Sequence, residues 1–133
     1  MEENEKKLSK VGIVSCSGED LPEGTISRLA TLEVLHHKKP FDTTTICLPL
    51  FIAGGEGDRM FAKNHPTITV DGCEKLCAKK ATEKYSGKVA HSINVRDFIK
   101  SGDDVNDSEK KILSEVADAI YLKVDEIFKE NNK

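Results

Sequence analysis

Hydrophobic residues along this chain follow two different periods, and the changes between them divide it into alternating elements. The segment "KVGIVSC" (10–16) is a short, almost continuous apolar run rich in Val and Ile, followed by the polar "SGED". Such a run predicts a strand buried on both faces and then a turn. "TITVD" (67–71) predicts a second strand of this kind, and "TTTICLPL" (43–50) and "KVAHSINVRDFI" (88–99) predict two more.

Between these runs the apolar residues recur every three or four positions, which is the period of an amphipathic helix. Thr25 is expected to cap the first helix, which "HHKKP" closes with bases and a proline. A short helix is predicted around 58–63, near a loop at "AGGEGDR", and a longer one over 74–85. The segment 108–130 has the most regular helical pattern. Its apolar positions are Leu113, Val116, Ala117, Ile120, Val124, Ile127 and Phe128, and those of the first helix are Ile26, Leu29, Ala30 and Val34.

Strands that alternate with helices imply right-handed crossovers and a mainly parallel sheet. We therefore predict a single-domain α/β protein with a three-layer Rossmann-like fold over residues 10–133 and a mainly parallel sheet of about four strands. The length of 133 residues is that of one ordinary domain. Residues 1–9 are charged and show no period, so they are predicted to be a disordered tail.

Charge and cysteine content narrow the classes of function. Lys and Arg number 20 against 23 Asp and Glu, and the two signs are mixed along the chain, so we expect no nucleic-acid partner. The start has no secretion signal, and no apolar run approaches the roughly 20 residues that span a bilayer, so we expect a cytoplasmic protein with no membrane partner. In such a chain four cysteines indicate metal ligands, catalytic thiols or small buried hydrophobes rather than disulfides.

The positions of the cysteines favour a shared site. Cys16, Cys47 and Cys73 each follow a predicted strand, and in a parallel sheet all carboxyl ends meet at one edge, where ligands of open α/β sheets bind. Cys77 lies one predicted helical turn after Cys73, which would put both thiols on one helix face and in its first turn, where the dipole favours thiolates. Four converging thiolates form a tetrahedral zinc site, so we predict that these four cysteines bind Zn²⁺.

Three motifs in this chain resemble the signatures of the DGC domain family, named for its Asp-Gly-Cys motif. They are "VSCSGE", "CLPLFIAGG" and "DGCEKLCA", and they lie in the family's order within residues 11–98. Members of that family are described as zinc-binding, and the resemblance implies that the ligands are Cys16, Cys47, Cys73 and Cys77. Asp71 and Gly72 complete the third motif. We expect Asp71 to form a turn or to accept a hydrogen bond beside the ligands, rather than to act as a catalytic base.

Two other functions fit the same thiols. In the first, Cys16 is the nucleophile of a redox or reductase enzyme and the other cysteines resolve it, as in phosphatase-like arsenate reductases. Those enzymes place an arginine after five intervening residues, where this chain has Pro22. In the second, the protein is a carrier that passes a metal ion or sulfur to a protein partner.

Overall fold

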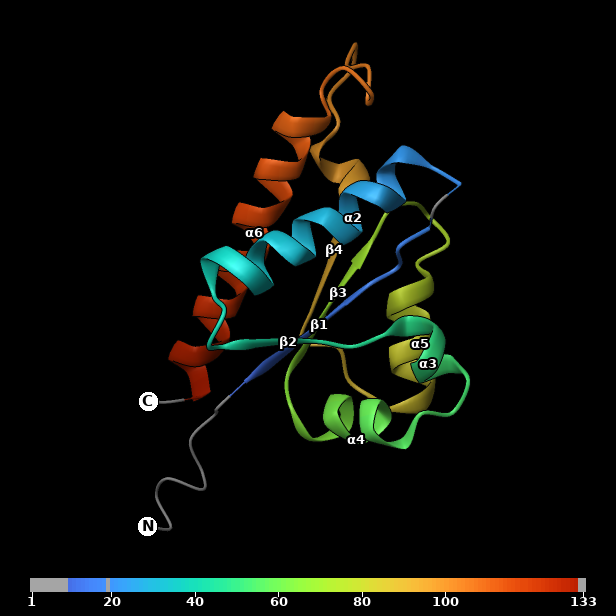
Figure 1. Cartoon of the computed structure of the whole chain (residues 1–133), viewed down its shortest axis with the longest axis vertical. Coiled ribbons are helices and arrows are strands. Elements are labelled where there is room, and N and C mark those ends of the chain that lie inside the picture. Colours follow the sequence, from blue (N-terminus) through green and yellow to red (C-terminus); the bar gives the residue numbers. More distant parts are fainter. Residues whose placement is uncertain (1–9, 19, 132–133) are drawn as a thin grey trace.

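Four parallel strands form a single sheet in the order β2-β1-β3-β4 (Figure 1). The computed structural model describes residues 10–18 and 20–131, so the tail predicted over residues 1–9 lies outside the described residues. The strands are β1 (Val11–Ser15), β2 (Thr43–Thr45), β3 (Thr67–Asp71) and β4 (His91–Asn94). In the register, Gly12 lies opposite Thr67 and Ser15 opposite Val70, so β1 and β3 end side by side.

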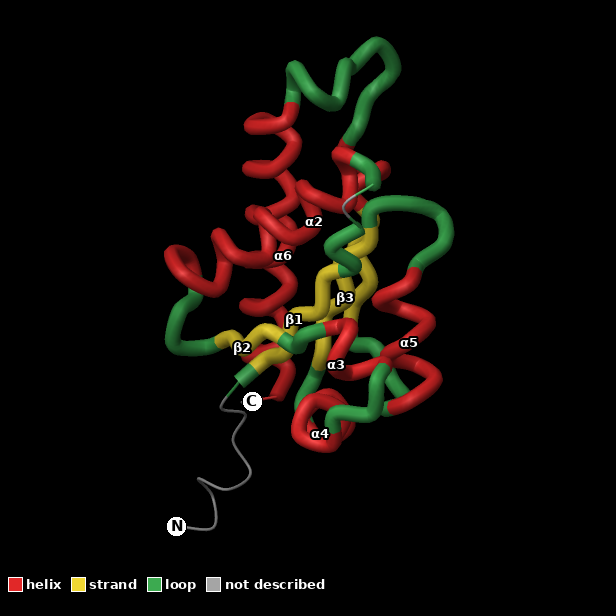
Figure 2. Tube along the Cα trace, turned by 45° about the vertical axis from the view of Figure 1, so that its right-hand side comes forward, coloured by secondary structure: helices red, strands yellow, loops and turns green. Residues whose placement is uncertain are grey.

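Helices cover both faces of the sheet (Figures 1 and 2). On one face lie α2 (Pro22–Glu33), its π-helical extension η1 (Val34–Lys38) and α6 (Glu109–Asn131). On the other lie α3 (Leu48–Ile52), α4 (Glu56–Asn64) and α5 (Cys77–Tyr85), and a 3-10 turn, η2 (Val95–Phe98), follows β4. The prediction of a three-layer Rossmann-like fold with a parallel sheet is confirmed.

The alternation of side chains in β1 supplies two hydrophobic cores. Val11 and Ile13 pack with α2 and α6, whereas Val14 packs with the α3, α4 and α5 side. All of β1 is buried, because successive side chains point to opposite faces and both faces are covered. This explains why the strand appears in the sequence as an unbroken apolar run.

Several predicted boundaries are wrong, each for a local reason. The helix α2 begins at Pro22, because a proline at the first helical position has no N–H to satisfy, so Thr25 lies inside the helix and is not its cap. The predicted strand 43–50 ends at Thr45. Its second half belongs to α3, in which Pro49 lies in the first turn. The segment 88–99 holds β4 and then η2 rather than one strand.

Two further helix boundaries also differ from the prediction. The expected loop "AGGEGDR" is partly helical, since α4 begins at Glu56. The expected helix 74–85 begins only at Cys77. By contrast, "TITVD" is β3 as predicted, and α6 spans the predicted segment to within one residue at each end.

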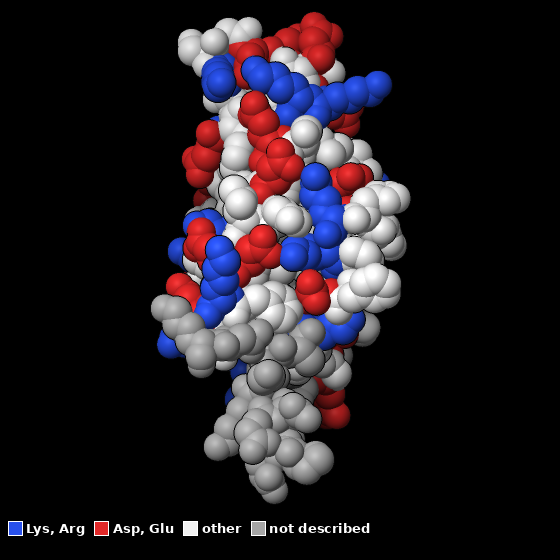
Figure 3. Space-filling model, turned by 90° about the vertical axis from the view of Figure 1, so that its left-hand side faces the viewer, with Lys and Arg blue, Asp and Glu red and all other residues white. Residues whose placement is uncertain are grey.

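The outer face of α2, η1 and α6 carries charges of both signs. Lys38 Nζ lies 3.1 Å from Asp118 Oδ1, and Lys39 Nζ lies 2.8 Å from Asp125 Oδ1, so these pairs link η1 to α6. Figure 3 shows the blue and red side chains interleaved over this face. Within the described ranges, none of the helices combines the length and the apolar character needed to cross a membrane.

Candidate metal centre

The candidate site lies at the carboxyl ends of the two central strands. The backbone N–H of Cys16 donates to the carbonyl oxygen of Val70 at 2.9 Å and so continues the β1–β3 ladder by one residue. The loop after β1 and the loop after β3 therefore begin next to each other. Strand β2 lies beyond β1, and Cys47 follows its last residue, Thr45, by two positions at the same edge of the sheet.

Two glycines bring both loops into backbone contact with the start of α2. A Cβ atom on Gly72 would lie 2.7 Å from the backbone nitrogen of Gly24 and 2.8 Å from the carbonyl carbon of Glu23. A Cβ atom on Gly24 would in turn overlap the carbonyl group of Gly18. Only glycine permits so close an approach. The Gly of the Asp-Gly-Cys motif therefore holds the β3–α5 loop against the start of α2.

Three of the four cysteines line one cavity at this edge. Cys16, Cys73 and Cys77 border a space of about 510 Å³ between the two loops. Cys16 and Cys73 are half-buried, and Cys77 is exposed. The charged residues along the same cavity are Asp20, Asp71, Glu74, Lys75 and Arg96. The structure thus brings together thiols from two loops that are distant in the sequence.

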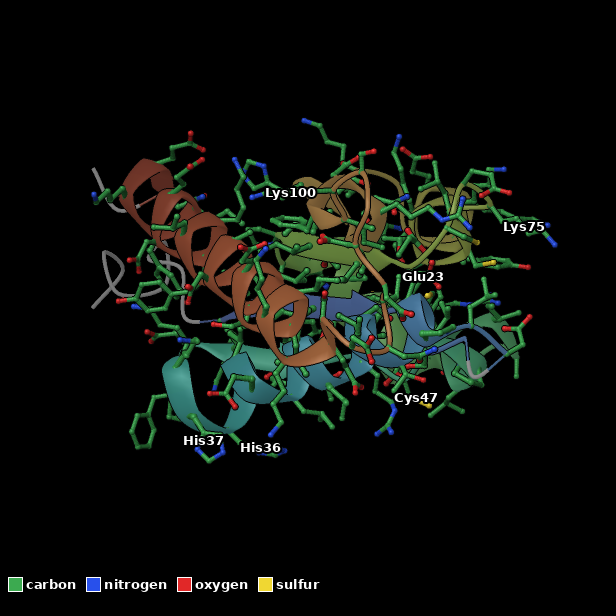
Figure 4. The ribbon with its side chains drawn as sticks, turned by 90° about the horizontal axis from the view of Figure 1, so that it is seen from above. Glu23, His36, His37, Cys47, Lys75 and Lys100 are labelled. Carbon is green, nitrogen blue, oxygen red and sulfur yellow. The ribbon has the colours of Figure 1, made fainter. Side chains whose placement is uncertain are left out.

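Cys47 lies outside that cavity. It is the N-cap residue of α3 and is exposed, and its backbone N–H donates to Asp58 Oδ2 at 3.2 Å. Cys47 lines a separate cavity of about 280 Å³, together with Ser15 and Ser17. Glu23 lies in the first turn of α2. In Figure 4, Lys75 is labelled above Glu23 and Cys47 below it. The loop after β1 therefore has a cavity on each side.

The helical relationship predicted for Cys73 and Cys77 is wrong. Leu76 has a left-handed backbone with φ of 54°, and the regular helix α5 starts only after it. Cys73 lies in the preceding bend, where its carbonyl oxygen accepts hydrogen bonds from Leu76 N at 3.3 Å and from Asn94 Nδ2 at 3.1 Å. Only Cys77 occupies the first turn of α5, so the spacing of one helical turn does not relate the two thiols.

Asp71 sets the position of α5. Its side chain is 1% exposed, and its Oδ1 and Oδ2 atoms accept from the backbone N–H groups of Ala78 at 2.8 Å and Lys79 at 3.2 Å. Leu76, the N-cap residue of α5, supplies no side-chain cap, so Asp71 performs that role from the end of β3. Burial raises the pKa of Asp71 above its ordinary value, and the two N–H groups and the Lys79 charge offset part of that effect.

This pKa shift predicts a pH dependence of stability. Because the folded state binds the Asp71 proton more tightly than the unfolded state, the free energy of unfolding should fall as the pH rises from the ordinary value of 3.8 to the raised pKa. Asp71→Asn removes this contribution. In urea titrations of chelator-treated protein at a series of acidic pH values, the variant should lose less stability over that interval than wild type does. Equal slopes for the two proteins would contradict the prediction.

The sequence interpretation did not predict the contacts that side chains of other elements make around the site. Ser27 of α2 lies 3.5 Å from Cys16 Sγ through its Oγ atom, and Asn94 at the end of β4 holds Cys73. Arg59 of α4 donates to the carbonyl oxygens of Phe51 at 2.7 Å and Ile52 at 3.0 Å, and so caps the end of α3. No local sequence signal marks these residues, because each contact joins elements that only the fold brings together.

The thiols point to no common centre in this arrangement. Among the residues that the structure describes, no three His, Cys, Asp or Glu side chains are arranged to hold a metal ion. A cysteine places its sulfur by one torsion with three staggered positions. Rotation about this torsion changes the direction in which each sulfur atom points along the cavity wall. The donor set of three thiols suits a soft or borderline ion such as Zn²⁺.

The fold and the cavity define an α/β protein with thiols gathered at the carboxyl edge of a parallel sheet. In a comparison with family models, the DGC domain matches residues 12–120. The chain therefore belongs to the DGC domain family. No curated protein and no solved structure matches it in the same comparisons.

Proposed function

We propose that this protein binds one zinc ion at the carboxyl edge of its sheet. The observation that supports this most directly is the shared cavity of Cys16, Cys73 and Cys77. Sulfur ligands from two loops of a folded chain are typical of zinc sites, and each thiol that binds the ion releases a proton. The motifs of the DGC family support the same ligands.

Cys47 is the proposed fourth ligand. It lies at the same edge of the sheet but on the other side of the loop after β1, so its approach requires a shift at the start of α3. With Cys47 as fourth ligand, four thiolates would hold the ion, which suits a structural site. Without Cys47, three thiolates would hold it, and the ion could then supply metal-assisted hydrolysis.

The shared cavity also favours a second function, a thiol enzyme. In that case the Cys16 thiolate attacks an oxidising substrate and forms a covalent adduct with it. The thiolate of Cys73 or Cys77 then attacks the sulfur of Cys16, which releases the substrate reduced by two electrons and leaves a disulfide. The arginine that would clamp an oxyanion is missing at Pro22, which begins α2 instead. Arg28, further along α2, is exposed and lines the cavity of Cys47 rather than that of Cys16. Arg96 does line the cavity of Cys16, but its Nη1 atom lies 3.0 Å from Glu74 Oε1, so a carboxylate already pairs with its charge. We therefore favour the metal site.

Metal analysis and mild oxidation separate the two functions. Protein purified without added metal should contain about one zinc ion per chain by elemental analysis. Brief exposure to dilute peroxide should leave its cysteines unchanged until a chelator removes the ion. A thiol relay would instead form one defined disulfide rapidly in the untreated protein, which mass spectrometry detects. Absence of any thiophilic metal, together with four freely titrating thiols, would refute the metal site.

A further inference from the structure

A buried hydroxyl group lies behind the thiol of Cys16. Ser27 is on the inner side of α2 and is 0% exposed. Its Oγ atom lies 2.6 Å from the carbonyl oxygen of Gly24, 3.4 Å from the backbone nitrogen of Ser17 and 3.5 Å from Cys16 Sγ. One hydroxyl thus contacts the start of α2, the loop after β1 and the sulfur.

Counting protons identifies the donor in the contact with sulfur. A serine hydroxyl has one proton and two lone pairs. Ser27 donates its proton to the carbonyl oxygen of Gly24, because a carbonyl oxygen can only accept and this contact is the shortest of the three. The Ser17 N–H can only donate to Ser27. The remaining lone pair of Ser27 faces Cys16, so the thiol S–H is the donor.

The backbone around Cys16 is shaped to make these contacts. Ser17 has φ of 54°, in the left-handed region that a residue other than glycine seldom occupies. Its hydroxyl lies 2.9 Å from the hydroxyl of Ser15, and its N–H is directed to Ser27. Such a conformation persists only where its surroundings hold it. Ser27 is one of the groups that holds it.

We propose that Ser27 is a positioning residue for Cys16. Its Oγ atom accepts the S–H hydrogen bond and thereby orients the sulfur toward α2 in the metal-free protein. If the proposed zinc function is correct, binding at Cys16 breaks this bond: the S–H bond is lost, a sulfur–zinc bond forms, and the proton passes to solvent. The proposal concerns the metal-free protein and can be tested without any metal.

The test uses the full chain with Cys47, Cys73 and Cys77 each replaced by Ser, so that Cys16 carries the single thiol. The S–H stretching band in a Raman spectrum moves to lower frequency when the thiol donates a hydrogen bond. Ser27→Ala should therefore move the band to higher frequency. It should also speed alkylation of Cys16 by roughly 2- to 10-fold, the factor that corresponds to one neutral hydrogen bond.

Thr31→Val is the matched control. Thr31 is also buried on α2, and its hydroxyl donates to the backbone oxygen of Ser27 at 2.8 Å without contacting a cysteine. This variant should leave the S–H band of Cys16 in place. An unmoved band in Ser27→Ala, or an equal movement in both variants, would overturn the proposal.

A second measurement covers the case in which Ser27→Ala does not fold. In the same single-thiol chain with Ser27 intact, the S–H band of the folded protein should lie below the frequency of a thiol that has no hydrogen-bond acceptor, such as a small thiol dissolved in an alkane. A folded-state band at that higher frequency would overturn the proposal. Neither measurement uses zinc, so a result that overturns the role of Ser27 can be told apart from a result that refutes the proposed metal function.

Discussion

Gly72→Ala is expected to lower the free energy of unfolding by about 1–3 kcal/mol, the usual cost of forcing an added methyl group into a packed site. The new Cβ atom would meet the backbone of Glu23 and Gly24, which cannot rotate away as a flexible side chain could. The loop after β3 would have to move from α2 and carry Cys73 with it. Urea unfolding followed by circular dichroism measures the loss of stability.

Gly57→Ala provides the control for this experiment. Gly57 lies in α4, and a Cβ atom placed there would have no heavy atom within 4 Å apart from its chain neighbours and the helix backbone. Alanine should therefore be neutral there or stabilise the protein by up to about 1 kcal/mol. If Gly72→Ala unfolds at the same urea concentration as wild type, the loop after β3 is not in backbone contact with α2.

Replacement of single cysteines by Ser is expected to have the largest effect on metal binding. Cys16→Ser, Cys73→Ser and Cys77→Ser should each weaken zinc retention by roughly 100-fold or more, beyond the loss typical of residues that only support a ligand. Each should also lose the stabilisation that zinc gives wild type, which is about 2.7 kcal/mol when free zinc is 100 times the Kd. Asp71→Asn should have a milder effect, because it displaces α5 without removing a thiol.

The Cys47→Ser variant decides between the two forms of the site. Metal content and melting temperature, each measured with and without chelator, should change as in the other three variants if Cys47 is a ligand. If Cys47→Ser matches wild type in both, the site has three cysteines and an open position. Wild-type zinc content in Cys16→Ser, Cys73→Ser and Cys77→Ser alike would contradict the proposed ligands.

The layered fold could be predicted from the sequence because buried positions are apolar and recur with the period of the strand or helix that contains them. Strands β1 and β3 are covered on both faces and appear as unbroken apolar runs, whereas α6 is covered on one side and repeats its apolar residues at helical spacing. The helix α3 shows no such period in the sequence. Its five residues are too few to show a period, and "LPLFI" is as apolar as a strand.

The convergence of thiols could be predicted only as far as it depends on sheet topology. Cys16 and Cys73 follow adjacent parallel strands, so their proximity depends on the strand order alone. The relative placement of Cys73 and Cys77 depends on Asp71. Its carboxylate accepts hydrogen bonds from the backbone N–H groups seven and eight residues later, and these bonds determine where α5 begins. The separation of Cys47 depends on Asp58 and on the short α3. Contacts of this kind leave no pattern in a single sequence.

The place of β2 at the edge of the sheet determines what would have to move for Cys47 to join the proposed site. β2 is a three-residue strand at the edge, bonded to β1 alone and followed by a five-residue helix. An edge strand with bonds on one side opens at a lower free-energy cost than β1 and β3, which are each bonded on two sides. Ile46, Leu48 and Phe51 after β2 are nevertheless buried and hold this segment against the sheet. If Cys47 is a ligand, its approach would therefore move the edge of the sheet and leave the central strands in place, at the cost of disturbing these core contacts.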